Sequence, residues 1–330
     1  MWHVHGSWTT AFVQGAHRYL LPVLPEGGPW GGGRPAAWDW LASAVEVPAA
    51  ELAGTHVDVV VLQRPEEWEL AERWLGRRLG RDVPVVFLGH NAPREHAATT
   101  RHPMADRDDV LLVHVTHFNR LMWDNGSTRT AVIEHGVVDP GHRYTGELES
   151  AAVVVNEPVR RGRITGTDLL PEFARATPLD VFGIGVDRLD LGPHVRPVGD
   201  LPQHRMHAEM ARRRAYVHPL RWTSLGLSLI EAMHLGMPVV ALATTEAAEA
   251  VPPGTGYCST NVDRLVRDLR ELMGEPGLAR ELGAEARAHA LHRYGLDRFL
   301  RDWDEVLGEV IDRRRSAAPR PLAGATIGRS

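Results

Sequence analysis

The sequence predicts an α/β protein built from two Rossmann-like domains that face each other across a cleft. Three observations carry this prediction. Short apolar, β-branched runs recur along the chain, helix-like segments separate them, and the pattern occurs as two consecutive sets joined across residues 139–150. Runs that are apolar on both faces are typical of buried parallel strands, and strands that alternate with helices form βαβ units.

The first set contains four predicted strands: Asp58–Leu62, Val83–Leu88, Val110–Val115 and Thr130–His135. A helix is expected to cross between the first two, because residues 66–79 (EEWELAERWLGRRL) carry spaced apolar side chains. The Gly-rich residues 26–37 interrupt this pattern. They lack a G-x-G-x-x-G order, which favours a mobile surface loop over a phosphate-binding loop.

The second set begins near Ala151. Its predicted strands are residues 151–158, 179–185, 214–220 and 237–242, and helix-like stretches cover residues 168–176 and 224–236. Three helices are expected to finish the chain. Asn261 is placed to cap the first of them, and the other two cover residues 278–291 and 297–314.

The composition excludes several chemistries. The chain of 330 residues contains 37 basic residues, and every one of them is arginine. The absence of lysine excludes P-loop nucleotide binding, Schiff-base catalysis and the protein kinases. With 42 acidic residues the net charge is −5, which argues against a sequence-independent nucleic-acid binder. The single cysteine, Cys258, excludes a disulfide framework and a Cys-rich zinc module.

No apolar run approaches the ~18 residues of a membrane-spanning helix, and the opening residues lack the order of a signal peptide. We therefore expect a cytoplasmic protein without an integral membrane segment. No basic amphipathic helix stands out, so peripheral contact with a membrane is left open.

The most informative segment is residues 218–241, HPLRWTSLGLSLIEAMHLGMPVVA. A strand ends at His-Pro, a polar loop follows, and a helix is predicted to begin near Ser224. Backbone N–H groups of Ser224, Leu225 and Gly226 would then form an anion site at the helix start. The segment resembles the donor-binding signature of glycosyltransferase family 4, close to PS-x-x-E-G-F-G-L-x-x-x-E-A-M-A-x-G-x-P-V-V-A.

This resemblance implies roles for two positions. Glu231 falls on the second glutamate of the signature, which holds the ribose hydroxyls of the donor nucleotide in that family. The first glutamate, which contacts the donor sugar, is replaced by Thr223. A neutral hydroxyl makes weaker hydrogen bonds than a carboxylate, by roughly 1 kcal/mol or more. We expect a different grip on the sugar in preference to loss of activity.

A second motif, residues 156–170 (NEPVRRGRITGTDLL), resembles the family's G-R-L-x-x-x-K-G-x-D-x-L. In the family, its arginine and lysine neutralise the donor diphosphate. The resemblance aligns Arg160, Gly166 and Asp168 with the arginine, glycine and aspartate, and it places Thr165 on the lysine. The flanking Arg161 and Arg163 are candidates to replace that lysine, because a guanidinium can hold phosphate through two hydrogen bonds.

Three positions in the first half complete the candidate site. His90 follows a predicted buried strand, and such strand ends line the crevice of open α/β sheets. The family often has a histidine there, facing the donor sugar, which makes His90 a catalytic candidate together with Arg160. Residues 4–15 (VHGSWTTAFVQG) occupy the place of the family's first strand and Gly-rich loop, with Gly15 on the acceptor side. Gly136, in a turn after a predicted strand, is interpreted as a backbone requirement.

The resemblance implies a GT-B fold and transfer of a hexosyl-type sugar, with retention of configuration, from a UDP-, GDP- or ADP-linked donor to an acceptor hydroxyl. No cofactor, metal or nucleic acid would be required. Four segments are expected: an acceptor-side domain (1–147), a nucleotide-sugar-binding domain (148–297), a helix that crosses back to the first domain (298–313) and a disordered tail (314–330).

Three alternatives remain. HGSW near the start and Gly226–Ile230 (GLSLI) partly resemble α/β-hydrolase motifs, but Ile230 stands where a nucleophile elbow needs glycine. The pairs His3/His5, His114/His117 and Asp106/Asp108 suggest a metal enzyme without forming one convincing site. A catalytically inert sugar-nucleotide-binding protein is suggested by Thr223.

Overall fold

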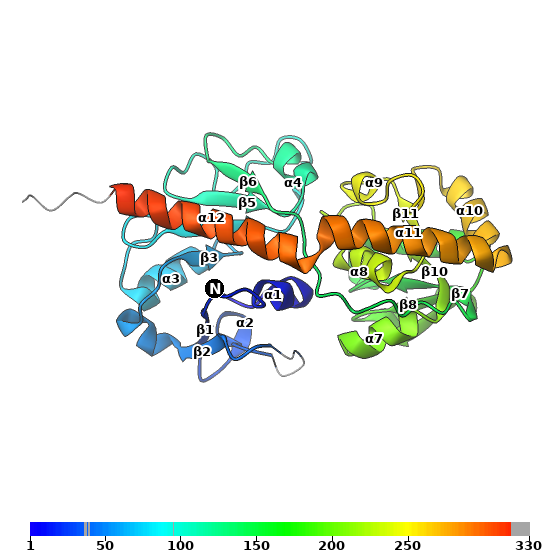
Figure 1. Cartoon of the computed structure of the whole chain (residues 1–330), viewed down its shortest axis with the longest axis horizontal. Helices are drawn as coiled ribbons and strands as arrows, with labels where there is room; N and C mark the ends of the chain where they lie inside the picture. Colours follow the sequence, from blue (N-terminus) through cyan, green and yellow to red (C-terminus); the bar gives the residue numbers. More distant parts are fainter. Residues whose placement is uncertain (36–37, 39, 95, 318–330) are drawn as a thin grey trace, which may run out of the picture.

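The structure is a computed structural model that describes residues 1–35, 38, 40–94 and 96–317. The described chain forms two lobes, with two long helices running end to end along one side of both (Figure 1). Every strand pair in its three sheets is parallel. The predicted α/β class with two Rossmann-like domains is therefore confirmed.

The first domain is built on a four-stranded sheet in the order β3-β4-β5-β6. Its strands are β3 (Val60–Leu62), β4 (Val85–Gly89), β5 (Leu111–His114) and β6 (Thr130–Val132). They coincide with the four predicted apolar runs, and β3, β4 and β5 are buried at every position. The predicted crossing helix is α3 (Glu67–Leu75), and α4 (His117–Met122) follows β5.

The opening of the chain differs from the expected strand and Gly-rich loop. Residues Gly6–Phe12 form helix α1 instead. Trp8, Ala11 and Phe12 follow the i, i+3, i+4 spacing of a helix face, and all three are buried. The strands β1 (Tyr19–Val23) and β2 (Ala44–Pro48) form a separate two-stranded sheet.

The Gly-rich segment expected to be a loop contains one short helix, α2 (Gly28–Gly31), and its residues 36 and 37 lie outside the described part. A 3-10 helix, η1 (Ala49–Gly54), follows β2.

The second domain is built on a six-stranded sheet in the order β12-β11-β10-β7-β8-β9. Its strands are β7 (Leu148–Val154), β8 (Leu179–Phe182), β9 (Val195–Gly199), β10 (Arg213–His218), β11 (Val239–Leu242) and β12 (Gly256–Ser259). The sequence predicted the four inner strands. It missed the edge strands β9 and β12, which are only partly buried and therefore lack a continuous apolar run.

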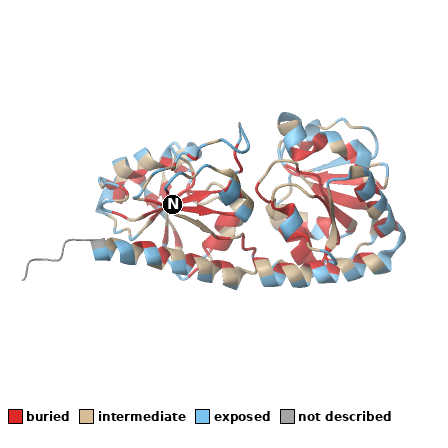
Figure 2. Ribbon diagram, turned by 90° about the horizontal axis from the view of Figure 1, so that it is seen from above, coloured by how far each residue is buried: buried red, intermediate tan, exposed pale blue. Residues whose placement is uncertain are grey.

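Helices cover both faces of this sheet, and the strands form a buried centre in each lobe (Figure 2). The helical elements of the second domain are α5 (Pro158–Arg161), η2 (Gly162–Thr165), η3 (Thr167–Leu169), α6 (Leu170–Phe173), η4 (Val186–Arg188), α7 (Gln203–Met210), α8 (Leu227–Leu235), α9 (Ala247–Ala250), α10 (Val262–Gly274) and α11 (Pro276–Tyr294). The predicted cap of α10 is confirmed, since the Asn261 side chain accepts a hydrogen bond from the Arg264 N–H at 3.0 Å.

The last helix, α12 (Leu296–Ala317), packs against the first domain. Phe299 and Trp303 on this helix belong to the same buried cluster as Trp8 and Phe12 of α1. The helix is longer than predicted, because residues 314–317, expected to be disordered, are helical. Ion pairs from Arg313 and Arg315 to acidic residues one turn earlier accompany the extension. Residues 318–330 lie outside the described part.

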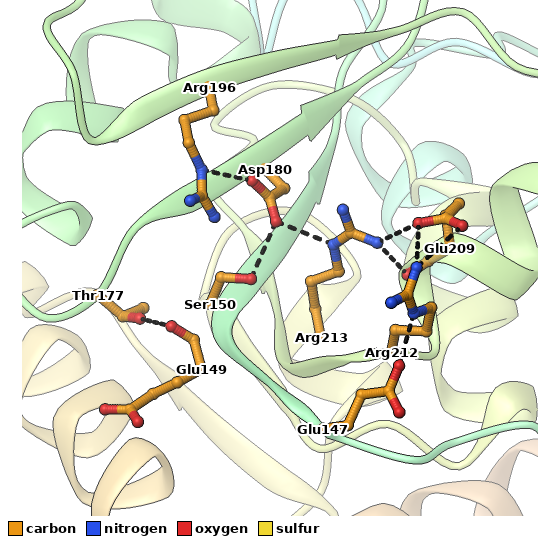
Figure 3. A network of polar contacts seen from close by, with 9 residues as sticks. All are labelled: Glu147, Glu149, Ser150, Thr177, Asp180, Arg196, Glu209, Arg212 and Arg213. Atoms are coloured by element: carbon orange, nitrogen blue, oxygen red, sulfur yellow. Dashed lines mark hydrogen bonds and ion pairs between the residues drawn. The ribbon is translucent and has the colours of Figure 1, made fainter.

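A polar network at the amino ends of the second sheet holds α7 in place (Figure 3). The buried Asp180 carboxylate accepts hydrogen bonds from Ser150 at 2.9 Å, from Arg196 at 2.7 Å and from Arg213 at 2.9 Å. Arg213 also donates to Glu209 of α7 at 2.7 Å. The network therefore ties α7 to β7, β8, β9 and β10.

Across the described ranges, none of the helices is both long enough and apolar enough to traverse a membrane.

Candidate functional site

The carboxyl ends of the two large sheets face each other, and residues that follow the strands make contacts across the domain boundary. The indole N–H of Trp222, which follows β10, donates to the Pro93 carbonyl at 2.6 Å. The Ser224 hydroxyl donates to the carbonyl of His90, which follows β4. Glu246, after β11, accepts a hydrogen bond from the Phe118 N–H at 2.8 Å. Strand ends of both domains thus form one site.

Glu231 lies on α8 at this boundary, and its side chain is only 3% exposed. Its Oε1 accepts hydrogen bonds from the Ser7 hydroxyl of the first domain at 2.9 Å and from the Gln203 amide of α7 at 2.9 Å. His207 Nε2, one turn further along α7, lies 3.3 Å from Oε2. The predicted ribose-binding carboxylate is therefore surrounded by three polar groups from two elements, α1 and α7.

These contacts keep Glu231 ionised. Burial is the largest single influence and acts to raise the pKa of this carboxyl group. The contacts from His207, Ser7 and Gln203 act together in the opposite direction, and the pKa stays below its ordinary value. The site therefore holds a buried negative acceptor that can bind hydroxyl groups strongly.

His90 is buried just past the end of β4. Its Nε2 lies 2.7 Å from Gln63 Oε1, while the Gln63 amide nitrogen donates to the Trp2 carbonyl. Nε2 therefore carries the proton, and Nδ1 is left as an acceptor. The His5 ring packs edge-on at a centroid distance of 4.2 Å. Burial is the main reason that the pKa of His90 lies well below its ordinary value, so the ring is neutral.

Basic groups meet beside this boundary. Arg160 and Arg161 end helix α5, and Arg94 comes from the loop after β4. Burial is the main cause that lowers the pKa of Arg161, and the charges of Arg160 and Arg94 add to it. Arg160 has only a loose contact with Glu157, at 3.7 Å. The two domains thus bring positive charge together where an anion could be held.

Arg163 is exposed but paired with a carboxylate, and Thr165 is buried. Arg163 donates to Asp168 at 3.2 Å, and Arg221 also binds that carboxylate. Arg221 is the main reason that the pKa of Asp168 is lowered. Thr165 is fully buried, and its hydroxyl is engaged with Gly162 and with the hydroxyl of Thr167. The prediction that Thr165 contacts the donor is contradicted by this burial.

The expected helix start is displaced. Helix α8 begins at Leu227, three residues after the predicted position, and Gly226 is its N-cap. Ser224 and Leu225 are therefore buried loop residues, and the predicted anion site at a helix start over these positions is wrong. A Cβ on Gly226 would lie 2.6 Å from the His218 ring, so a side chain here would crowd the loop. Thr223 is half-buried in the same loop.

At three glycines, neighbouring atoms lie too close to leave room for a side chain. Gly15 lies beside Tyr19 and Leu300 of α12, and its place on the acceptor side stays a prediction. At Gly136 a Cβ would collide with Phe299 of α12. Gly166 has φ +70°, and a Cβ there would meet the Pro219 carbonyl. Gly166 thus meets a backbone requirement, whereas Gly136 leaves room for the Phe299 side chain.

Four residues at the site were missed by sequence reasoning: Ser7, Arg94, Gln203 and His207. Ser7 was noticed only as part of a hydrolase-like HGSW. Gln203 and His207 carried a usable signal, because polar residues four positions apart share one helix face. Within the described residues, no group of three His, Cys, Asp or Glu side chains is arranged to hold a metal ion.

Comparison with known proteins shows what the second domain is similar to. Residues 186–289, which include Gln203, His207 and Glu231, match the family model described as Glycosyl transferases group 1. A GDP-mannose-dependent monoacylated alpha-(1-6)-phosphatidylinositol monomannoside mannosyltransferase of Corynebacterium glutamicum is 29% identical over 180 residues. The match covers 49% of this chain and 45% of the relative, so the chain matches less than half of the relative's length.

Solved structures share the fold. Sucrose-phosphate synthase from Thermosynechococcus elongatus superimposes with a TM-score of 0.68 at 13% identity, over 92% of both chains. Anabaena HepE in complex with UDP superimposes with a TM-score of 0.62 at 15% identity, over 81% of this chain and 87% of HepE. The two domains therefore form a GT-B fold, and residues 186–289 are similar to the group 1 glycosyltransferases.

Proposed function

We propose that this protein transfers a hexosyl-type sugar from a nucleoside diphosphate sugar to an acceptor hydroxyl, with retention of configuration. The buried, ionised Glu231 at the domain boundary carries the proposal. It lies in the segment that matches the family, and its carboxylate already binds a hydroxyl group. The ribose of the donor nucleotide offers hydroxyl groups of the same chemistry.

Arg160 and Arg161 would neutralise the donor diphosphate, and Arg94 would add charge from the opposite domain. Arg163 contributes less, because Asp168 engages it. A diphosphate leaving group gains negative charge as its bond to the sugar breaks, and fixed guanidinium groups stabilise that charge. No metal ion is needed in this scheme. Full activity in EDTA supports it, and a requirement for added Mg²⁺ or Mn²⁺ would count against it.

His90 would position the donor sugar. Its neutral ring offers the Nδ1 lone pair, which can accept a hydrogen bond from a sugar hydroxyl. Thr223 would make the weaker contact that replaces the family's first glutamate. Replacing Thr223→Glu is therefore expected to raise turnover by strengthening the grip on the sugar. A fall in turnover would show that this site holds its sugar differently.

Thermal-shift measurements with UDP, GDP, ADP and dTDP, and then with their sugars, test the proposal most directly. We expect one nucleotide series to raise the melting temperature, and the Glu231→Ala variant to lose most of that shift. The donor that stabilises the protein would then be used in fluorinated or ¹³C-labelled form, and NMR would assign the anomeric configuration of its product. An inverted anomeric centre would refute retention, and stabilisation by none of the nucleotides would refute the proposal itself.

A catalytically inert sugar-nucleotide-binding protein is the second candidate. The replacement of the first glutamate by Thr223 favours it, because the donor sugar then lacks its charged partner. Nucleotide binding without turnover across a broad panel of acceptors would support this candidate. Donor hydrolysis or transfer at any measurable rate, lost in Glu231→Ala, would exclude it.

A further inference from the structure

The Ser7 hydroxyl lies in a closed triangle of hydrogen bonds at the domain boundary. It donates to Glu231 Oε1 at 2.9 Å and accepts from the Gln203 amide nitrogen at 3.1 Å. The same amide nitrogen donates to Glu231 Oε1 at 2.9 Å, which closes the triangle. One hydroxyl group is thus bound by a charged acceptor and a neutral donor together.

This arrangement is a complete recognition site for a hydroxyl group. A hydroxyl has one proton to donate and lone pairs to accept, and the pair of Glu231 and Gln203 satisfies both kinds of interaction. The carboxylate is buried and ionised, so its hydrogen bond to a hydroxyl is of the strong, charge-assisted kind. The hydroxyl that fills the site belongs to the opposite domain, 224 positions away in the sequence.

We propose that Gln203 and Glu231 together bind a ribose hydroxyl of the donor nucleotide, and that Ser7 occupies this position until the nucleotide displaces it. The inference rests on the proposed function, and it adds Gln203 as a binding residue and Ser7 as an internal competitor. His207 stands behind the pair, with its Nε2 3.3 Å from the second carboxylate oxygen.

The start of α1 also contacts another residue of the candidate site. His5, two residues before Ser7, packs its ring 4.2 Å from that of His90. Gly6, between them, is pressed against the Trp38 ring so closely that a Cβ would collide with it. Residues 5–7 therefore contact both the Glu231 pair and the ring of His90, the residue proposed to face the donor sugar.

Isothermal titration of the full chain with UDP, GDP and ADP and with their 2′- and 3′-deoxy analogues tests the inference. Ser7→Ala removes the competitor, so the nucleotide that binds the wild type should bind about five to ten times more tightly. Gln203→Leu should reduce the preference for the ribonucleotide over the deoxy analogue that lacks the recognised hydroxyl by about tenfold. This ratio is insensitive to competition by Ser7, because both ligands face the same competitor.

Two matched controls separate these effects from general damage. Ser228→Ala removes a hydroxyl of α8 that faces Tyr216 inside the second domain, and Gln14→Leu removes an amide at the opposite end of α1. Both should leave nucleotide affinity and the ribo/deoxy ratio unchanged within about twofold. Melting curves of each variant identify any that fail to fold, and Ser7→Ala then carries the test without Gln203→Leu.

The outcomes distinguish a failure of the roles proposed for Ser7 and Gln203 from a failure of the proposed function. Nucleotide binding with an unchanged affinity in Ser7→Ala would overturn the role of Ser7 and leave the proposed function standing. An unchanged ribo/deoxy ratio in a folded Gln203→Leu variant would overturn the role of Gln203. Absence of nucleotide binding in the wild type and in Ser7→Ala alike would overturn the proposed function as well.

Discussion

Replacing Trp303→Ala tests whether α12 is an integral part of the first domain. Trp303 is only 1% exposed. Its ring meets those of Phe12 at 4.9 Å, Trp8 at 5.7 Å and Phe299 at 6.4 Å, all edge-on. Its indole N–H has no hydrogen-bond partner among the described residues, so the substitution breaks no hydrogen bond.

The cost therefore comes from lost packing alone. Truncating a buried tryptophan costs about 3–5 kcal/mol, and edge-on aromatic pairs add roughly 0.5–1.5 kcal/mol each to ordinary burial. We expect the free energy of unfolding of the first domain to fall by about 4 kcal/mol. With a urea dependence of about 2 kcal/mol per molar, the unfolding midpoint should fall by about 2 M.

Urea titrations followed by circular dichroism measure this change. We expect the first domain to unfold at the lower midpoint while the second domain keeps its own transition, because Trp303 contacts the first domain. Leu121→Ala is the control, since Leu121 is 80% exposed in the same domain, and it should cost less than about 0.5 kcal/mol. A loss below about 1 kcal/mol in Trp303→Ala would refute the packing argument, and so would an equal loss in both domains.

Three further predictions concern stability. Gly136→Ala should lower the free energy of unfolding by about 1–3 kcal/mol, because the new Cβ would displace Phe299 and push α12 outward. An unchanged melting temperature would contradict this. Asn261→Ala should lower the stability by about 1 kcal/mol, because it removes the cap that accepts a hydrogen bond from the Arg264 N–H. Asn261→Asp should lower the stability little. Thermal melts measure both variants, and equal losses of stability would show that the cap contributes nothing. Burial lowers the pKa of four buried histidines, to about 3 or 4: His102, His114, His135 and His218. Because the pKa in the folded state lies below the ordinary 6.5, the stability that these groups provide is complete above pH 6.5 and is lost as the pH falls toward 4. As the pH falls, the unfolded chain takes up protons before the folded protein does. Each histidine should therefore lower the free energy of unfolding by about 1 kcal/mol between pH 6.5 and 5.5. A free energy of unfolding that stays constant over this range in urea titrations would refute the assignment.

The inner strands were predictable because each consists of consecutive apolar residues. Runs such as Val85–Gly89 are buried on both faces of a sheet, so every position is apolar or small. The edge strand β9 carries exposed Arg196 and Pro197, and β12 is half-buried throughout, so neither shows such a run. The sequence analysis missed helix α1. The resemblance to the family predicted a strand and a Gly-rich loop there, although Trp8, Ala11 and Phe12 have the spacing of a helix face.

The second-domain candidates came from resemblance to a known family. Glu231 and Arg160 lie in compact segments that resemble its motifs, and their roles stay predictions. The partners of these residues were hidden from sequence reasoning: Ser7 and Arg94 come from the other domain, and Gln203 and His207 lie on a separate helix. Arg163 looked equal to Arg160 in sequence, and only the structure shows that Asp168 engages it.

The sequence by itself determined the α/β class, the two consecutive sets of strands and the cap of α10, because each of these depends on residues close together in the chain. The tertiary structure decided where α12 packs, that Thr165 is buried, and that Glu231 is met by Ser7 from the opposite domain. These features depend on which surfaces meet after folding, and the pairing of surfaces far apart in sequence leaves no local pattern to read.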